Sequence, residues 1–190
     1  MTTMPVPDAT ELTDGPSWSI RPEQPIDLDQ IHDLHREAFH RPDEADLVDA
    51  IRSGPDFLPD LSLVAVADDG SVLGHILVSR VRFEPHAVDA ARTDALALAP
   101  LAVLQPHEGR GIGSALTRDA LALADARDEP FTVVVGSPAY YGRFGFAPAA
   151  EHSIDGPYDA AGEAFQVRPR PGGAPLTPGS VVYPPMFEGL

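Results

Sequence analysis

Apolar residues recur every three or four positions in two early segments of the chain, which is the spacing of one helix face. The first segment predicts a helix from Asp27, as its N-cap, to about His40. The second predicts a helix that Asp43 caps and that stops at the Ser-Gly-Pro sequence of residues 53–55. The residues expected to face the core are Leu28, Ile31, Leu34, Ala38 and Phe39 in the first helix and Ala45, Leu47, Val48 and Ile51 in the second.

Short apolar runs bounded by turn residues predict strands on either side of these helices. They cover residues 18–21, 61–67, 71–83, 95–104 and 131–135, with shorter strand-like pieces at 165–167 and 181–183. Asp68-Asp69-Gly70 predicts a hairpin turn, because Asp-Gly accommodates the positive φ that such turns need. The run at 95–104 is apolar enough for a strand buried on both faces, and Pro100 inside it predicts a bulge or an interruption of pairing.

A third helix is expected after a glycine turn at 109–113 and runs to about Arg127. Its expected inner face consists of Ile112, Ala115, Leu116, Ala120, Leu123 and Ala124. The order of elements predicts a mixed α/β fold without internal repeats. Residues 1–16 are polar, contain proline and lack a period, so we predict a disordered lead-in before a single domain at 17–190.

Composition excludes several classes of protein. A chain of 190 residues suits one domain with a core that needs no covalent staple. The absence of cysteine excludes disulfides, thiolate metal sites and a cysteine nucleophile. No basic N-terminal segment leads into an apolar run, and no apolar stretch of about 18 residues occurs. We therefore predict a cytoplasmic location and no membrane partner.

The net charge of −16 changes the expected partners. A chain this acidic should be repelled by the phosphates of nucleic acid, so a nucleic-acid partner is not expected. Two interpretations of the acidic excess stay open at this point. It is either a solvated surface or an acidic cleft that steers a cationic acceptor.

The most informative stretch is Glu108-Gly109-Arg110-Gly111-Ile112-Gly113-Ser114, between a predicted strand and a predicted helix. Glycines at such a turn let several backbone amides approach a phosphate at the positive end of the helix. A P-loop is excluded because the chain has no lysine. A dinucleotide fingerprint is disfavoured, because its third glycine would fall on Leu116 or Ser114. A tight turn without a ligand stays open.

This stretch resembles the acetyl-CoA loop of the GNAT N-acetyltransferase superfamily, whose pattern is Gln/Arg-x-x-Gly-x-Gly/Ala. The flanking sequences Leu-Ala-Pro-Leu-Ala-Val-Leu at 98–104 and Tyr-Tyr-Gly-Arg-Phe-Gly-Phe at 140–146 look like its YhbS-like branch. The likeness covers roughly residues 18–185. It implies a single GNAT-type domain with a central mixed, mostly antiparallel sheet flanked by helices.

The resemblance also implies acetyl-CoA as the cosubstrate, with no metal. Carried onto this chain, it assigns the pyrophosphate to the amides of Gly109, Arg110, Gly111, Gly113 and Ser114, and the pantetheine arm to the backbone of Leu101, Ala102 and Val103. Glu108 departs from the family pattern, which has Gln or Arg there. A carboxylate near a pyrophosphate is unfavourable unless it points away.

For the chemistry, the resemblance implies direct attack of an amine on the thioester, with Tyr141 as the general acid. Tyr141 stands four residues before Gly145-Phe146, where such enzymes often carry this tyrosine, and Tyr140 is the second choice. A phenol can protonate the departing thiolate. The N–H of Val103 is the expected donor to the oxyanion.

The general base and the acceptor stay open. Candidate bases are Glu84, His86, Asp94, His75 and Glu44. His32 and His35 are expected on an exposed helix face, where they form at most a weak metal pair. The first interpretation is an N-acetyltransferase acting on a primary amine of a small molecule or peptide. The alternatives are a non-catalytic acyl-CoA-binding or regulatory module and a plain interaction domain, and a homodimer is left open.

Overall fold

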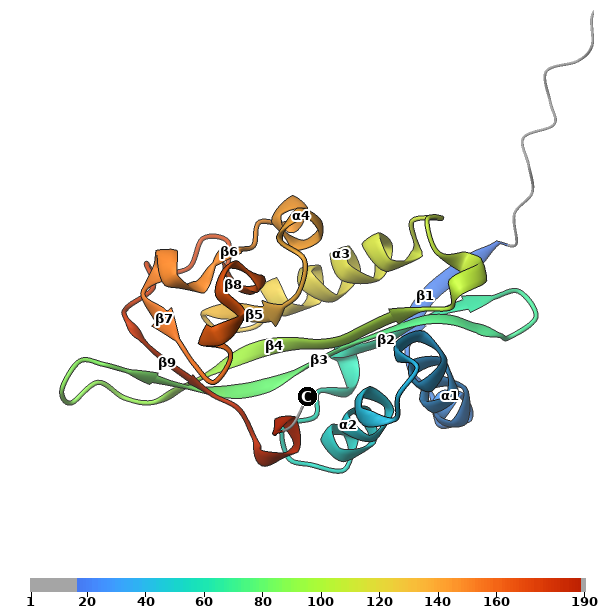
Figure 1. Cartoon of the computed structure of the whole chain (residues 1–190), viewed down its shortest axis with the longest axis horizontal. Helices are drawn as coiled ribbons and strands as arrows, with labels where there is room; N and C mark the ends of the chain where they lie inside the picture. Colours follow the sequence, from blue (N-terminus) through green and yellow to red (C-terminus); the bar gives the residue numbers. More distant parts are fainter. Residues whose placement is uncertain (1–16, 189–190) are drawn as a thin grey trace, which may run out of the picture.

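The computed structural model of the chain describes residues 17–188, so the predicted lead-in at 1–16 lies outside the described residues. One continuous sheet carries helices on both faces (Figure 1). The elements in chain order are β1 (Trp18–Pro22), α1 (Leu28–Phe39), α2 (Asp43–Arg52), β2 (Ser62–Ala67), β3 (Val72–Pro85), β4 (Thr93–Val103), α3 (Ile112–Asp125), β5 (Phe131–Val135), α4 (Pro138–Tyr141), β6 (Ala147–Pro148), β7 (Ile154–Asp155), β8 (Phe165–Pro169) and β9 (Gly179–Val182).

The sheet is mixed and mostly antiparallel, as expected. Its main path runs β1-β2-β3-β4-β5-β8-β6, and β9 joins the far half of β3 with β7 alongside it. Only the β4–β5 and β7–β9 pairs among these strands are parallel. The sequence did not predict β6 and β7, because strands of two residues leave no periodic pattern.

The centre of the sheet is interrupted where β4 contains Pro100. Register passes from Val78 opposite Leu98 to Ile76 opposite Leu101, so two residues of β4 stand against one of β3. This bulge confirms the interruption predicted from the proline. The parallel register of β4 with β5 extends only over Leu96 and Ala97, so the two strands part beyond that point. The edge of β4 from residue 99 onward is therefore free of a neighbouring strand among the described residues.

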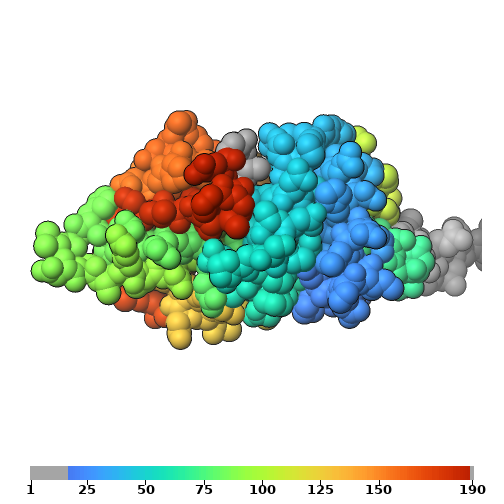
Figure 2. Space-filling model, turned by 90° about the horizontal axis from the view of Figure 1, so that it is seen from below, coloured from blue at the N-terminus to red at the C-terminus, as the bar shows by residue number. Residues whose placement is uncertain are grey.

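Helices α1 and α2 cover one face of the sheet, and α3 and α4 cover the other (Figure 1). Figure 2 shows the α1–α2 face, with the C-terminal segment lying beside the helices. Phe187, from that segment, packs into the cluster that these helices form with the sheet. The other buried members of the cluster are Ile31, Leu34, Leu47, Val48, Ile51, Val64, Val66, Val72, Leu77 and Ala102.

The inner face of α3 differs from the expectation at three positions. Leu123 is 39% exposed, whereas Leu121 and Thr117 are buried. The side chain of Thr117 can be buried because its hydroxyl donates to the carbonyl of Gly113 at 2.9 Å. The helix is thus rotated slightly from the orientation that apolar spacing alone suggested, which a satisfied polar residue permits.

The two predicted helix caps also differ in detail. Asp27 occupies the N-cap of α1, but its carboxylate accepts two hydrogen bonds from Arg21, at 2.6 and 2.9 Å, and makes none to the helix amides. The prediction that Asp43 caps α2 is wrong. The N–H of Asp46 donates to the carbonyl of Pro42 at 2.9 Å, so Pro42 is the N-cap and Asp43 the first helical residue. Among residues 17–188, no helix is both long and apolar enough to span a bilayer.

The junction of β3 and β9 should not tolerate a side chain at Gly179. A Cβ there would lie 2.4 Å from the Phe83 ring and 2.7 Å from the carbonyl oxygen of Glu84. We expect Gly179→Ala to lower the free energy of unfolding by about 1–3 kcal/mol, because a packed core does not yield to added volume. Thermal unfolding measures it. Gly142→Ala is the control, because a Cβ there meets nothing within 4 Å, and an equal loss in both variants would contradict the argument.

Candidate functional site

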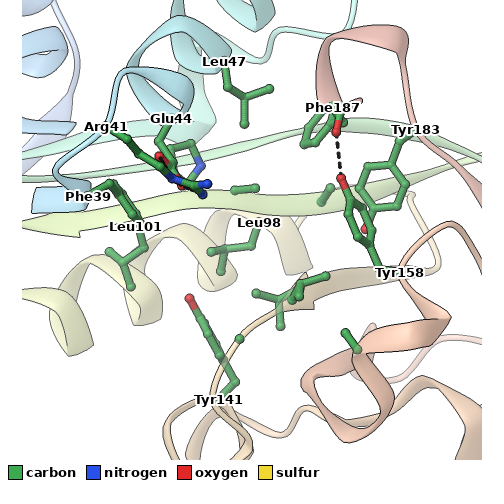
Figure 3. A pocket seen from close by; sticks show the side chains of 17 residues that line it. Phe39, Arg41, Glu44, Leu47, Leu98, Leu101, Tyr141, Tyr158, Tyr183 and Phe187 are labelled. Carbon is green, nitrogen blue, oxygen red and sulfur yellow. Dashed lines mark hydrogen bonds and ion pairs between the residues drawn. The ribbon is translucent and has the colours of Figure 1, made fainter. Parts of the chain in front are cut away.

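A cavity of about 480 Å³ lies where β4 and β5 part (Figure 3). Segments far apart in sequence form its walls. The adjoining ends of β4 and β5 supply residues 97–101 and 134–136, and α4 supplies Tyr141. The α1–α2 region supplies Phe39, Arg41, Glu44 and Leu47, and the C-terminal third supplies Tyr158, Ala161, Tyr183 and Phe187.

The free edge of β4 presents backbone groups toward this opening. The N–H of Leu104 donates to the carbonyl of Leu73 at 2.9 Å, and directly opposed residues alternate between bonded and non-bonded pairs in an antiparallel ladder. Ala102 therefore directs its N–H and C=O toward β3, whereas Leu101 and Val103 direct theirs to the edge that β5 has left. Of the three residues predicted to bind through their backbone, Leu101 and Val103 have the suitable orientation.

The glycine loop leads into the N-terminus of α3. Gly109 and Gly111 adopt φ values of 72° and 85°, which favour glycine, and Gly111 is the N-cap without a side-chain cap. The N–H groups of the first turn, at residues 112–114, have no acceptor within the helix. The side chains of Glu108 and Arg110 are exposed, so the carboxylate of Glu108 has room to point away from these amides.

A basic groove that the sequence did not predict lies beside this loop. Ser114, Arg118, Arg143 and Arg168 line it, together with residues of α3 and Phe144. Arg168 is already paired with Asp125, at 2.6 and 2.8 Å. The guanidinium of Arg143 lies 4.7 Å from the centre of the Tyr140 ring. Arg118 follows Ser114 by four residues, so a search for basic residues one turn past the loop would have found it.

Tyr141 lies in the cavity, and its hydroxyl points into the space between the strands (Figure 3). Its ring is 9% exposed and packs edge-on against Tyr140 and Phe146, with centroid distances of 4.9 and 5.7 Å. Burial, and to a smaller extent Tyr140, raises the pKa of its phenol above the usual value, so it stays protonated at neutral pH. A Cβ at Gly136 would lie 2.4 Å from the Tyr141 ring, so only glycine lets the ring take this position.

Tyr140 takes a different direction. Its hydroxyl lies 3.3 Å from the Thr117 hydroxyl on α3, and a Cβ at Gly113 would lie 3.2 Å from the same oxygen. The tyrosine hydroxyl is therefore beside the first turn of α3, near the glycine loop. The structure thus separates the two tyrosines, one at the cavity and the other at the loop.

Among the five candidate bases, only Glu44 lines the cavity. Both of its carboxylate oxygens accept hydrogen bonds from the Nε of Arg41, at 3.0 and 3.1 Å, and Arg41 Nη2 also bonds to it. Figure 3 shows this pair opposite the hydroxyl of Tyr141. The candidates that do not line the cavity are Glu84, His86, Asp94 and His75.

His35 and His75 belong to a buried polar network, so the prediction of an exposed His35 is wrong. Both rings are fully buried, and His35 Nε2 lies 2.8 Å from His75 Nδ1. Ser62 donates its hydroxyl hydrogen to Glu23 at 2.6 Å, so its oxygen accepts from His75 Nε2 at 2.9 Å, and His75 Nδ1 accepts from His35. His32 instead contacts Asp49 at 2.8 Å, so the two histidine rings take part in different interactions. Apolar spacing could not reveal a histidine buried by hydrogen bonding.

The network ends on an ionised carboxylate. Burial would raise the pKa of Glu23, but the nearby ring of His75 and hydrogen bonds from Arg52 and Ser62 outweigh it and lower the pKa to about 2. Because Arg52 is on α2 and His35 on α1, these bonds hold the α1–α2 wall of the cavity to the sheet.

This network should make the protein sensitive to acid. Burial lowers the pKa of His35 and His75 in the folded state, so their contribution to stability is complete above the unfolded pKa of about 6.5 and is lost as pH falls. For each histidine that stays neutral in the folded state, the free energy of unfolding falls by about 2 kcal/mol between pH 6.5 and pH 5. We expect the thermal midpoint to fall between pH 7.5 and 5, and His35→Phe to reduce that fall while lowering the midpoint at pH 7.5. His40→Asn is the control, at an exposed histidine with positive φ, and should leave the fall in thermal midpoint between pH 7.5 and 5 unchanged. An unchanged slope in His35→Phe would contradict this account.

Sequence comparisons give a consistent family. Residues 19–149 match the family described as "Acetyltransferase (GNAT) domain". The chain is 36% identical over 148 residues to the uncharacterized N-acetyltransferase YhbS of Escherichia coli K12, covering 78% of this chain and 84% of YhbS. It is 34% identical over 124 residues to the uncharacterized N-acetyltransferase YjhQ of the same strain, covering 65% of this chain and 66% of YjhQ.

Solved structures show the same fold. The crystal structure of YhbS from Escherichia coli in complex with CoA superposes with a TM-score of 0.76 at 31% identity, covering 93% of this chain and 95% of that one. A GNAT family acetyltransferase from Brucella melitensis, in complex with acetyl-CoA, superposes with a TM-score of 0.71 at 30% identity, covering 92% and 100%.

Proposed function

Because the chain belongs to the GNAT N-acetyltransferase family, we propose that it moves the acetyl group of acetyl-CoA to a primary amine of a small molecule or peptide. The observation that carries the proposal is a convergence at one cavity. The free edge of β4 and the hydroxyl of Tyr141 both meet there, and a short turn and the glycine loop lead from that strand into the first turn of α3. Relatives that share the fold were solved with CoA or acetyl-CoA, which supports the cosubstrate.

The residues of the chain fit each part of acetyl-CoA. The amides at 109–114 offer N–H donors and the positive helix end to the pyrophosphate. Leu101 and Val103 offer backbone groups to the amides of the pantetheine arm, as a neighbouring strand would. Arg118 and Arg143 offer positive charge to the remaining phosphate, on the nucleotide end.

The same residues suit direct acetyl transfer. Acetyl-CoA supplies an acetyl group on a thiol leaving group. The N–H of Val103 is directed to the edge where the thioester carbonyl would lie, so it can stabilise negative charge on that oxygen. Tyr141 remains protonated through neutral pH and can give its proton to the departing sulfur.

Calorimetry with acetyl-CoA, followed by thiol release against a panel of amines, tests the proposal. We expect a Kd in the micromolar range and thiol release with at least one amine. Binding without release across the panel would support the non-catalytic acyl-CoA-binding module instead. Absence of binding would overturn both. We further propose a catalytic domain at residues 17–190 and a cytoplasmic location, which truncation and cell fractionation test.

A further inference from the structure

The acidic excess of the chain does not extend into the cavity. Although the chain carries a net charge of −16, the charged side chains that line the cavity within residues 17–188 are one glutamate and one arginine. Glu44 and Arg41 neutralise each other through hydrogen bonds at 3.0 and 3.1 Å. A polyamine or an aminoglycoside would bring several ammonium groups to a site where Glu44, beside Arg41, has room to accept a hydrogen bond from one of them. The other ammonium groups of such a ligand would lose their hydration on entering the cavity without gaining a carboxylate partner.

The wall opposite the ion pair is aromatic. Tyr183 packs edge-on against Tyr158 on one side and against Phe187 on the other, with centroid distances of 4.9 and 5.0 Å. The Tyr158 hydroxyl donates to the carbonyl of Phe187 at 3.0 Å, so its polar group is engaged within the wall (Figure 3). Rings held in this way favour another aromatic ring, since edge-to-face pairs contribute beyond the area that they bury.

The cavity is also small. Its volume of about 480 Å³ is near the lower end of the roughly 300–1,000 Å³ of small-molecule sites, and the acetyl end of acetyl-CoA must share it. Figure 3 shows the Arg41–Glu44 pair and the aromatic wall on opposite sides, with Leu98 between them. An occupant therefore has a polar group at one end and an apolar ring at the other.

Building on the proposed acetyl transfer, we propose that the acceptor is a small aromatic monoamine with one primary amino group on a short alkyl chain. Its amino group lies at Glu44 and its ring lies against Tyr158, Tyr183 and Phe187. Glu44 binds the amine and accepts its proton as the nitrogen attacks. The positive charge of Arg41 nearby disfavours a second cation, so it favours the neutral, nucleophilic amine.

The step balances without another reactant. The nitrogen forms a bond to the acetyl carbon, the bond between carbon and sulfur breaks, and the sulfur takes a proton from Tyr141. The proton that leaves the nitrogen passes to Glu44, and exchange with solvent restores both side chains. The products are the N-acetylated amine and the CoA thiol.

Four amines of matched concentration test the acceptor class by thiol release. They are 2-phenylethylamine, hexylamine, spermidine and a short peptide with a free N-terminus. We expect kcat/KM for 2-phenylethylamine to exceed that of hexylamine about 10-fold, which corresponds to about 1.4 kcal/mol and lies within the range for one well-placed ring pair. Spermidine and the peptide should be slower still. A preference for spermidine or the peptide, or equal rates for the first two amines, overturns this inference and leaves acetyl transfer intact. Failure of all four, with acetyl-CoA bound, overturns the inference and counts against transfer itself.

Two variants test the residues. Phe187→Leu keeps apolar bulk but removes the ring, so it should reduce the preference for 2-phenylethylamine over hexylamine. Glu44→Gln should lower kcat/KM for 2-phenylethylamine at pH 7 and regain part of it as pH rises, because free amine then replaces the base. Acetyl-CoA Kd should stay near wild type in both, whereas the thermal midpoint should fall modestly, because Phe187 belongs to the buried cluster under α1 and α2 and Glu44 pairs with Arg41. An unchanged preference in Phe187→Leu, or a Glu44→Gln profile parallel to wild type, overturns the assignment of that residue.

Discussion

Replacing Tyr141 with phenylalanine should lower kcat by about 10²-fold while the Kd for acetyl-CoA stays near the wild-type value. General acids contribute roughly 10²–10⁴-fold, and a thiolate, as a fair leaving group, places this case at the lower end. The substitution keeps the ring that packs against Phe146 and removes only the hydroxyl that faces the cavity. Thiol release measures kcat with whichever amine proves active, and calorimetry measures Kd. The proton is needed in the transition state, so binding should not change.

Tyr140→Phe is the matched control, because its hydroxyl lies toward Thr117 on α3. Its effect on kcat should be much smaller. If instead Tyr140→Phe loses kcat and Tyr141→Phe keeps it, the two roles are exchanged. If neither variant loses activity, the proton comes from water or another residue. Gly136→Ala gives an independent check. Its added Cβ must displace the Tyr141 ring, so it should lower kcat as Tyr141→Phe does.

Gly113→Asp should abolish measurable binding of acetyl-CoA while the fold persists. The carboxylate would lie in the first turn of α3, where the pyrophosphate is proposed to bind. Two like charges about 4 Å apart cost about 4 kcal/mol at an effective dielectric constant of about 20, which corresponds to roughly 10³-fold in Kd. An acidic residue near a helix N-terminus is itself favourable, so α3 should remain folded.

Gly113→Ala separates charge from volume. Its Cβ would meet the Tyr140 hydroxyl at 3.2 Å and Val103 at 3.5 Å, which small movements relieve, so its effect on Kd should be far smaller. Calorimetry on both variants, with circular dichroism to confirm folding, measures the difference. Equal affinity of Gly113→Asp and wild type would exclude the loop as the pyrophosphate site.

Local patterns in the chain were enough to predict most of the fold. The apolar spacing of α1 and α2, the Asp-Gly turn before β3 and the glycine turn before α3 all lie at the predicted positions. These features depend on neighbours within a few residues, so the sequence carries them directly. Pro100 also predicted a feature of strand pairing, because a proline lacks the N–H that a strand donates and so interrupts pairing wherever the strand lies in the sheet.

The sequence by itself also determined the glycine loop, the tyrosine before Gly145-Phe146 and the family resemblance, each of which depends on a short run of residues. Only the tertiary structure decided which carboxylate reaches the cavity, because Glu44, Tyr158 and Phe187 meet there from segments far apart in the chain. It also decided that His35 is buried, since its Nε2 bonds to His75 on β3, and His75 in turn bonds to Ser62 on β2. The physical reason is the same in both cases: burial and charge pairing are set by contacts between distant segments, and no local period records them.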